Sequence, residues 1–284
     1  MRPFLVGLPI GVFDSGVGGL SVLREIRAAL PLENLHYVAD SGYAPYGDRS
    51  AAFIEARTHA IADFLTDLNV KAMVVACNTA TGVAVGALRE RTSMPVVAIE
   101  PAIKPAVSLT RTKVIGVLAT RQTTASPSVS RLVAEHGHDA RVILQPCPGL
   151  VEQVEIGALL EPKTRALLES YIHPLLEKGA DTLVLGCTHY PFLLTLIRDI
   201  VGPTVTVLDP APAVAQQLKR RLTEHNLIRK NLSDDGPKES STGQTHFWTS
   251  GDPAHAAATM TALWGAPIQV HALPQRYCAA PTES

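Results

Sequence analysis

Short hydrophobic runs alternate with longer amphipathic stretches along most of the chain. The runs are nearly continuous and rich in β-branched residues, which is typical of strands that helices cover on both faces. Helical spacing fills the stretches between them, as in Ser21–Leu30, Ala51–Leu68 and Phe192–Val201. This alternation predicts an α/β fold with mostly parallel sheets. The expected strands are Gly11–Phe13, Leu35–Ala39, Ala72–Ala76, Val96–Ile99, Val114–Leu118, Arg141–Leu144, Thr182–Leu185 and Val205–Leu208.

The last quarter of the chain is less regular. Residues 229–245 are polar and rich in turn-forming residues, so we expect an exposed loop there. A strand at Thr245–Thr249 and a helix at Pro253–Trp264 are expected to follow, and the residues from about Ala272 look irregular. The first residues, Met1 to Phe13, carry an early arginine and an apolar run, but glycines and a proline interrupt it and no clear cleavage site follows. We therefore expect a first β-strand there rather than a signal peptide.

Composition narrows the class of protein. A length of 284 residues predicts roughly two domains. With 46% hydrophobic and 18% charged residues, the chain is expected to fold around packed cores. The 25 basic and 26 acidic residues give a net charge of -1, so we expect neither nucleic acid nor a membrane surface as a partner. The sequence contains no run of about 18 apolar residues, so we expect no membrane span.

The two halves of the sequence repeat one pattern. A strand ends at a hydroxyl residue in each half, at Ser15 and at Thr120, and a later strand ends at a cysteine, Cys77 or Cys187. Ligands of open α/β sheets bind beyond the carboxyl ends of the strands. A helix that starts there stabilises a thiolate at its N-terminus. The pattern therefore predicts two thiols that approach one ligand from opposite sides.

The four cysteines also allow other interpretations. A lone cysteine at a strand end is usually a small buried hydrophobe, and a disulfide between Cys77 and Cys187 is a further alternative. Cys147, before a proline, is expected to be structural, and Cys278, near the end of the chain, incidental. Because the chain has no CxxC spacing, we expect no metal site, and free thiols in a reducing cytosol are the default.

Several motifs resemble the glutamate racemases of the aspartate/glutamate racemase superfamily. They are GVFDSGVGGLSVLREI (11–26), YVADSGYAPYGDRS (37–50), VVACNTAT (74–81), AIEPAIKPA (98–106), GVLAT with RQT (116–123), CPGLVEQVE (147–155) and LGCTHYPFL (185–193). One departure is Glu152, which stands where the family pattern has proline, while Glu155 falls at the family's acidic position.

The resemblance implies two pseudo-symmetric, doubly wound α/β domains, 1–101 plus 212–284 and 102–211, with the active site in the cleft between them. It implies cofactor-independent racemisation of glutamate, in which Cys77 acts on D-glutamate and Cys187 on L-glutamate. Asp14 is expected to serve Cys77, and His189 and Glu155 to serve Cys187. The expected substrate-binding residues are Asp14, Ser15, Tyr46, Gly47, Asn78, Thr79, Thr120, Thr123 and Thr188. The family also implies a cytoplasmic homodimer that supplies D-glutamate for peptidoglycan.

Elementary chemistry agrees with two thiols. Inverting one carbon requires a base on one face and an acid on the other. Asp14 and Glu155 are anions that would raise a neighbouring thiol pKa, so we interpret them as hydrogen-bonding or proton-accepting partners. The glycines from Gly16 to Gly19 lack the spacing of a nucleotide-binding loop, and we expect them to allow a tight turn before a helix that faces the ligand. An aspartate or hydantoin racemase, and a redox or ligand-binding protein without catalysis, remain alternatives.

Overall fold

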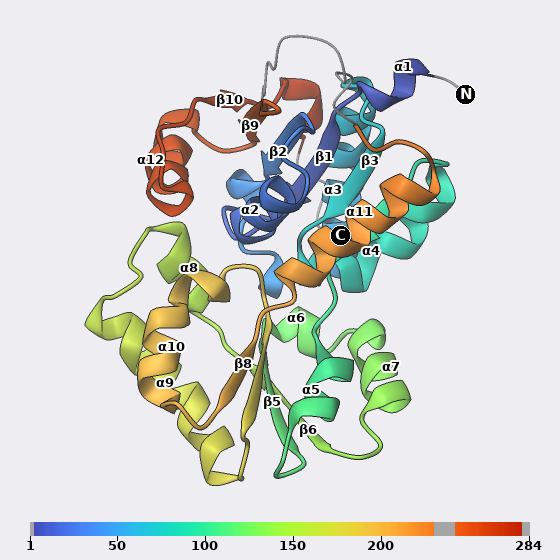
Figure 1. The fold of residues 1–284 in the computed structure, drawn as a ribbon. Helices are drawn as coiled ribbons and strands as arrows, with labels where there is room; N and C mark the ends of the chain where they lie inside the picture. Colours follow the sequence, from blue (N-terminus) through green and yellow to red (C-terminus); the bar gives the residue numbers. More distant parts are fainter. Residues whose placement is uncertain (1–2, 230–241, 280–284) are drawn as a thin grey trace.

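The computed structural model describes residues 3–229 and 242–279. Its elements form two parallel β-sheets with helices packed on them, one sheet in each half of the molecule (Figure 1). The predicted α/β class with largely parallel sheets is confirmed. The strands of the first sheet fall within the ranges 1–101 and 212–284, and those of the second within 102–211.

The first sheet has six strands, and every neighbouring pair in it is parallel. Its central strand β1 is buried along its whole length, which explains the unbroken hydrophobic run in the sequence. In spatial order the strands are β10 (Val270–Ala272), β9 (Thr245–Thr249), β2 (Leu35–Ala39), β1 (Ile10–Asp14), β3 (Ala72–Val75) and β4 (Val96–Ala98).

The second sheet repeats the inner part of the first. The order β2-β1-β3-β4 in the first sheet matches β6-β5-β7-β8 in the second, which is the structural counterpart of the sequence duplication. Ser15 and Thr120 follow the equivalent strands β1 and β5, and Cys77 and Cys187 come after the equivalent strands β3 and β7. The strands are β6 (Arg141–Pro146), β5 (Val114–Ala119), β7 (Thr182–Gly186) and β8 (Thr206–Leu208).

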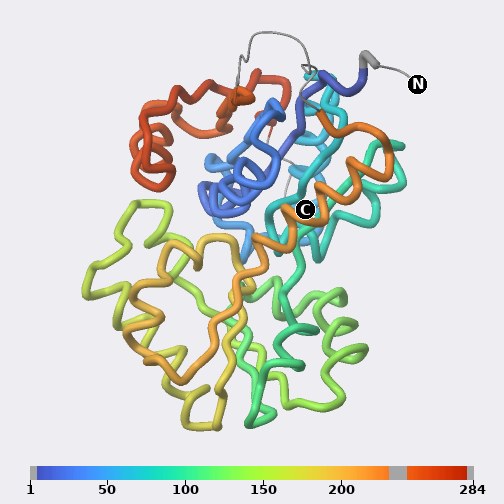
Figure 2. Tube along the Cα trace, in the orientation of Figure 1, coloured from blue at the N-terminus to red at the C-terminus, as the bar shows by residue number. Residues whose placement is uncertain are grey.

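Helices cover both sheets, and the chain crosses between the halves after β4 and again before α11 (Figure 2). The returning helix α11 packs against α2, so the C-terminal segment completes the first half. The helices are α1 (Pro3–Val6), α2 (Leu20–Ala29), α3 (Ala51–Asp67), α4 (Asn78–Arg91), α5 (Ile103–Leu109), α6 (Arg121–Thr124), α7 (Pro127–His136), α8 (Leu150–Glu155), α9 (Pro162–Glu177), α10 (Leu194–Val201), α11 (Ala211–Glu224) and α12 (Pro253–Trp264). Short 3-10 turns are η1 (Ser41–Tyr43), η2 (Tyr46–Asp48), η3 (Tyr190–Leu193) and η4 (Gln275–Tyr277).

The structure corrects the sequence prediction at three places. The expected strand Gly11–Phe13 lies within β1, but a short helix at Pro3–Val6, which the sequence did not predict, precedes it. The expected helix at 192–201 starts as a 3-10 turn and becomes α-helical only at Leu194. The C-terminal part is more regular than expected, because β10 adds a three-residue edge strand to β9. Most of the expected loop at 229–245 lies outside the described residues.

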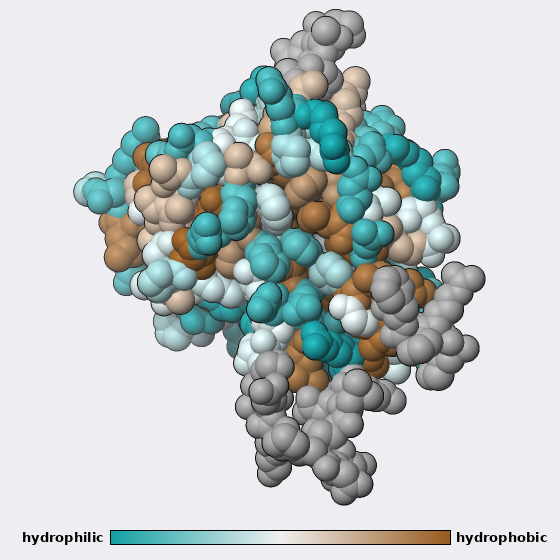
Figure 3. Space-filling model, turned by 90° about the horizontal axis from the view of Figure 1, so that it is seen from above, coloured by the Kyte–Doolittle hydropathy of each residue, from teal (hydrophilic) through white to brown (hydrophobic). Residues whose placement is uncertain are grey.

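In the described part of the chain, no helix combines the length and apolar character needed to cross a bilayer. Seen from above, hydrophilic and hydrophobic residues are intermixed on the visible surface (Figure 3).

Candidate active site

Cys77 lies just beyond β3 and caps the N-terminus of α4. Its Sγ accepts a hydrogen bond from the backbone N–H of Ala80 at 3.5 Å and lies 3.4 Å from Ser15 Oγ. Burial, and next the nearby Asp14 carboxylate, raise the pKa of the Cys77 thiol to about 12, although the bonds to Ser15 and Ala80 act in the opposite direction. At neutral pH Cys77 is therefore a protonated thiol.

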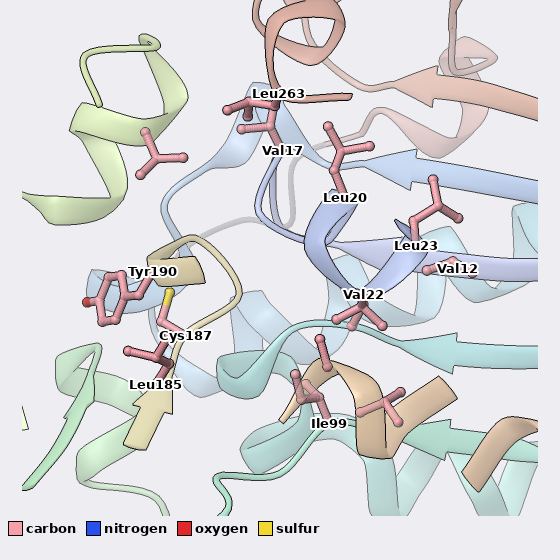
Figure 4. Packing of buried hydrophobic residues seen from close by; sticks show 14 of the residues in the cluster. Val12, Val17, Leu20, Val22, Leu23, Ile99, Leu185, Cys187, Tyr190 and Leu263 are labelled. Atoms are coloured by element: carbon pink, nitrogen blue, oxygen red, sulfur yellow. The ribbon is translucent and has the colours of Figure 1, made fainter. Parts of the chain in front are cut away.

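Cys187 lies beyond β7, at the equivalent place in the second half (Figure 4). Its Sγ is 3.6 Å from Nδ1 of His189. The sequence led us to expect an α-helix N-terminus next to this sulfur, and that expectation was wrong. The chain passes through His189 into the 3-10 turn η3, so an imidazole ring, rather than a long helix, is the group beside Cys187.

His189 links Cys187 to Glu155. Nε2 of His189 lies 2.6 Å from Oε1 of Glu155, and because a carboxylate only accepts hydrogen bonds, Nε2 carries the proton. Burial alone would lower the pKa of His189, but the Cys187 sulfur and the Glu155 carboxylate together raise it well above its ordinary value. The ring is thus held as an imidazolium, a cation that lies directly beside the Cys187 sulfur.

Asp14 is fully buried at the end of β1. One carboxylate oxygen accepts hydrogen bonds from the backbone N–H groups of Gly16 and Gly19, at 3.1 and 3.0 Å. The other accepts a bond from the Thr188 hydroxyl at 3.2 Å. Burial raises the pKa of Asp14 to about 6, even though His189 and the two N–H groups lower it. At neutral pH Asp14 is consequently an anion that connects the ends of β1 and β7.

The glycine-rich loop after β1 makes room for the His189–Glu155 pair. A β-carbon on Gly16 would lie 1.9 Å from Glu155 Oε1, and one on Gly18 would lie 2.3 Å from His189 Nδ1. The backbone N–H of Val17, between them, donates to Glu155 Oε1 at 2.8 Å. These glycines therefore leave space for the side chains of Glu155 and His189 from the other half, in addition to forming the turn that the sequence predicts.

Three threonine hydroxyls meet where α4 faces α6. The Oγ1 of Thr79 lies 3.0 Å from that of Thr120 and 3.1 Å from that of Thr123, and the last two are 3.0 Å apart. Thr120 also caps α6, because its hydroxyl accepts from the backbone N–H of Thr123. A cluster of this kind, next to two helix N-termini, can turn its O–H groups toward a carboxylate.

Asn78 is the most informative of the expected binding residues. Its side chain is buried, yet neither its amide nitrogen nor its amide oxygen has a hydrogen-bond partner. Buried polar groups are nearly always paired in folded proteins, and an orphaned pair of this kind requires an explanation. Because Asn78 lines the same cavity as the two cysteines, a ligand that offers both an acceptor and a donor explains it.

Tyr46 is placed differently from the other expected residues. It lines the cavity, but its hydroxyl donates to Asp40, which forms a buried ion pair with Arg57. The hydroxyl of Tyr46 is therefore occupied by Asp40, which leaves its ring or its backbone to contact a ligand. Gly47, the next residue, lies against Thr120, since a β-carbon there would be 3.0 Å from Thr120 Cβ.

Most of the residues predicted for the site line one small cavity. It is about 10 Å³, which is room for about one water molecule. Of the expected residues, Asp14, Glu155 and Thr123 lie behind this lining and contact it through hydrogen bonds. The lining residues are Ser15, Pro45, Tyr46, Gly47, Cys77, Asn78, Thr79, Thr120, Val151, Cys187, Thr188 and His189.

Some contributors were missed by sequence reasoning. Val17 acts through its backbone N–H, which no side-chain pattern reveals, and Ser21 donates from its hydroxyl to the carbonyl of Thr188 across the cleft. Pro45 and Val151 form apolar walls. Among the other thiols, Cys147 is buried and donates to the carbonyl of Gln145, and Cys278 lies partly exposed near the C-terminus. All four cysteines are free.

The geometry suits proton transfer on two faces of one small molecule. The neutral Cys77 thiol and the Cys187 sulfur, which lies beside an imidazolium, share one cavity. The hydrogen-bonding groups around them can pair with the ammonium and carboxylate groups of an amino acid. Within the described ranges, no three His, Cys, Asp or Glu side chains are grouped in a way that could hold a metal ion.

Known proteins share both the sequence and the fold. The Asp/Glu/Hydantoin racemase family model matches residues 10–218. A glutamate racemase of Ectopseudomonas mendocina is 50% identical over 264 residues, which cover 93% of this chain and 97% of the relative.

Solved structures agree with this assignment. A glutamate racemase isoform of Bacillus anthracis has a TM-score of 0.85 at 32% identity, covering 95% of this chain and 98% of that one. The glutamate racemase of Francisella tularensis in complex with D-glutamate has a TM-score of 0.82 at 28% identity, with the same coverage. With the paired thiols on the equivalent strands of two repeated halves, the chain belongs to the Asp/Glu/hydantoin racemase family, on its glutamate racemase branch.

Proposed function

We propose that this protein interconverts L- and D-glutamate by moving the α-proton between two cysteine thiols. The observation that carries the proposal is the orphaned amide of Asn78, which lies in one cavity with both sulfurs. An amino acid zwitterion presents a carboxylate acceptor and an ammonium donor close together, so it can satisfy both amide atoms at once.

Because Cys77 is a protonated thiol, the reaction is proposed to start from L-glutamate. Cys187, beside the imidazolium of His189, is the base that removes the α-proton, and Cys77 is the thiol that delivers its own proton to the opposite face. Cys187 then carries the proton, Cys77 is the thiolate, and the product is D-glutamate. The reaction is redox-neutral, and the reverse direction exchanges the two roles.

The remaining binding groups fit the carboxylates of the substrate. The hydroxyls of Thr79, Thr120 and Thr123 and the N-termini of α4 and α6 offer donors on one side of the cavity. Thr188 and Ser15 lie between the two sulfurs and the buried Asp14. Glutamate rather than aspartate or a hydantoin is the substrate that the 50%-identical relative supports.

Substrate entry requires the halves to separate. A cavity with room for about one water molecule cannot enclose glutamate, and hydrogen bonds such as Ser21 to Thr188 cross the cleft. We therefore propose that the cleft opens to bind substrate and closes around it, which also excludes water from the carbanion.

The finer expectations from the family resemblance are part of this proposal. They are a homodimer and a role in supplying D-glutamate for peptidoglycan in the cytosol, where a reducing environment keeps both sulfurs free of disulfide bonds. Light scattering coupled to size-exclusion chromatography tests the dimer, and a monomer at micromolar concentration contradicts it.

The function is tested by incubating the protein with L-glutamate in heavy water without added cofactor. We expect D-glutamate labelled with deuterium at the α-carbon, and we expect aspartate to react far more slowly. Cys77→Ser and Cys187→Ser should each abolish racemisation. Normal activity in both variants, or activity that requires an oxidised Cys77–Cys187 pair, contradicts the two-thiol mechanism.

A further inference from the structure

A buried tyrosine supports the glycine-rich loop from behind. Tyr37 lies in β2, beside β1, and its side chain is 0% exposed. Its hydroxyl donates to the backbone carbonyl of Gly16 at 2.7 Å. In the described part of the chain, no other donor reaches this carbonyl. The Tyr37 hydroxyl therefore holds the loop in place, although the residue lies outside the lining of the substrate cavity.

The carbonyl that Tyr37 holds belongs to the same peptide group as the N–H of Val17. This peptide is trans and planar, so its C=O and N–H bonds point in opposite directions. Tyr37 binds one end of the group, and the Val17 N–H at the other end donates to Glu155 Oε1 at 2.8 Å. A hydrogen bond to the carbonyl also polarises the peptide and strengthens its N–H as a donor. The Tyr37 hydroxyl therefore fixes the direction of the bond that the loop makes to Glu155 and strengthens that bond.

Glu155 in turn holds the histidine beside Cys187. The same oxygen, Oε1, lies 2.6 Å from Nε2 of His189, and Nδ1 of that ring lies 3.6 Å from Cys187 Sγ. A continuous series of contacts hence joins the Tyr37 hydroxyl in the first half to the Cys187 sulfur in the second.

Cys77 is not part of this series. Its sulfur contacts the hydroxyl of Ser15 and the backbone N–H of Ala80. Neither group belongs to the peptide that Tyr37 holds. The series that starts at Tyr37 therefore ends at one of the two sulfurs, that of Cys187.

The tyrosine hydroxyl is a permanent donor. Burial, and next the Asp14 carboxylate, raise the pKa of Tyr37 well above its ordinary value, so the hydroxyl keeps its proton at neutral pH. The ring packs edge-on against Phe247, with the ring centroids 6.3 Å apart. Gly19 makes room for the hydroxyl, since a β-carbon there would lie 3.0 Å from it. Packing and protonation state thus both keep the donor directed at Gly16.

We propose that Tyr37 is a positioning residue for proton transfer at Cys187, and that it acts through the Gly16–Val17 peptide and Glu155. The inference rests on the proposed function and adds a residue that touches neither the substrate nor a sulfur. Without the hydroxyl the peptide can rotate, Glu155 loses its donor from the loop, and the histidine ring beside the sulfur is held less firmly. Proton transfer at Cys187 then slows, while the other sulfur keeps its own partners.

Tyr37→Phe removes the hydroxyl and keeps the ring. We expect kcat/KM to fall about tenfold, which is about the effect of losing one hydrogen bond in the transition state. Because the two enantiomers have equal free energy, kcat/KM must fall equally in both directions. Tyr171→Phe is the matched control, because the Tyr171 hydroxyl also donates to a backbone carbonyl, that of Pro148, at 2.8 Å. The control should keep kcat/KM near that of the wild type.

Isotope effects show which proton transfer the variant slows. The measurement compares α-deuterated with ordinary glutamate in each direction, for the wild type and for Tyr37→Phe. With L-glutamate the label leaves to Cys187, so a slower transfer there raises the isotope effect on kcat/KM. With D-glutamate the label leaves to Cys77, and the slower step is the delivery of an unlabelled proton by Cys187, so the isotope effect falls. A loss of folded protein alone changes neither isotope effect.

Opposite shifts of the two isotope effects, upward with L-glutamate and downward with D-glutamate, support the inference. Unchanged isotope effects, shifts in the same direction, a wild-type rate in Tyr37→Phe, or an equal loss of rate in Tyr171→Phe overturns it. Wild-type protein that does not racemise glutamate refutes the proposed function instead.

A second variant carries para-aminophenylalanine at position 37. An aromatic amine is a weaker donor than a phenol hydroxyl, but it keeps a partner for the buried carbonyl of Gly16, so this variant is used if Tyr37→Phe does not fold. We expect a smaller loss of rate, with isotope effects that shift in the same two opposite directions. A loss of rate with the isotope effects of the wild type overturns the inference here as well.

Discussion

Gly18 and His189 approach so closely that a β-carbon on Gly18 would lie 2.3 Å from Nδ1 of the histidine ring. That nitrogen is the atom that faces the Cys187 sulfur. The lack of a side chain at Gly18 in the first half thus sets the position of the His189 ring in the second. In the proposed mechanism, the loop after β1 therefore determines which group lies beside the Cys187 sulfur.

Gly18→Ala should therefore impair catalysis more than folding. The added methyl group displaces the His189 ring, and a misplacement of about 1 Å can cost about 100-fold in rate. We expect kcat to fall by about that factor, measured with L-glutamate at saturation. Gly86→Ala is the control, because nothing lies within 4 Å of a β-carbon at Gly86 in α4. The control should keep kcat and gain about 0.5–1 kcal/mol in stability. An unchanged kcat in Gly18→Ala contradicts the argument.

Asp14→Asn should stabilise the protein at neutral pH while it reduces activity. Burial raises the pKa of Asp14 from 3.8 to about 6, so the folded state binds more protons than the unfolded state between these pH values. The contribution of Asp14 to stability is therefore lost as pH rises through this window, by about 3 kcal/mol in total. Denaturant unfolding should show the variant to be more stable above pH 6, with the difference disappearing below about pH 4. A difference that does not depend on pH would refute this account.

Asn78→Leu should separate ligand binding from stability. The orphaned amide costs free energy in the unliganded protein, so its removal should stabilise that state by about 1–3 kcal/mol, while KM rises. Thr81→Val is a matched control, since the Thr81 hydroxyl is also buried without a partner on α4 but lies outside the cavity lining. It should gain stability without a change in KM. Equal KM values in the two variants argue against Asn78 as a ligand.

The buried ion pair behind Tyr46 gives a prediction about stability. Arg57 and Asp40 are fully buried, and the same aspartate accepts the Tyr46 hydroxyl. Arg57→Met leaves the Asp40 charge unpaired and should cost about 3–5 kcal/mol in thermal or denaturant unfolding. Arg91→Met breaks the exposed pair with Asp63 and should cost less than about 1 kcal/mol. Equal losses of stability in the two variants would show that burial does not determine how much each ion pair contributes to folding.

Much of the fold and many of the candidate residues could be predicted from the sequence. Nine of the strands are recognisable from short segments rich in hydrophobic or β-branched residues, some fully buried as in β1 and others partly exposed as in β6, whereas β10 is a short edge strand without a periodic signal. The cysteines and hydroxyl residues at strand ends were recognisable because parallel strands bring their carboxyl ends to one edge.

Contacts across the cleft could not be predicted. The hydrogen bond from the Val17 N–H to Glu155 depends on how the two halves meet, which local patterns do not encode. The same is true of the close approach of His189 to Gly18. The same holds for the group beside Cys187, because the choice between an α-helix and a 3-10 turn at Tyr190 alters which atom faces the sulfur.

The pairing of β2 with β9 has a consequence for the newly synthesised chain. β2 forms residue pairs with β9 from Leu35 to Ala39, yet β9 lies some two hundred residues later in the sequence. The second half is continuous and can be completed on the ribosome while β2 still lacks one neighbour. An open, apolar strand edge is a template for unwanted association. Chains truncated before Thr245 are therefore expected to aggregate, even though they contain both cysteines.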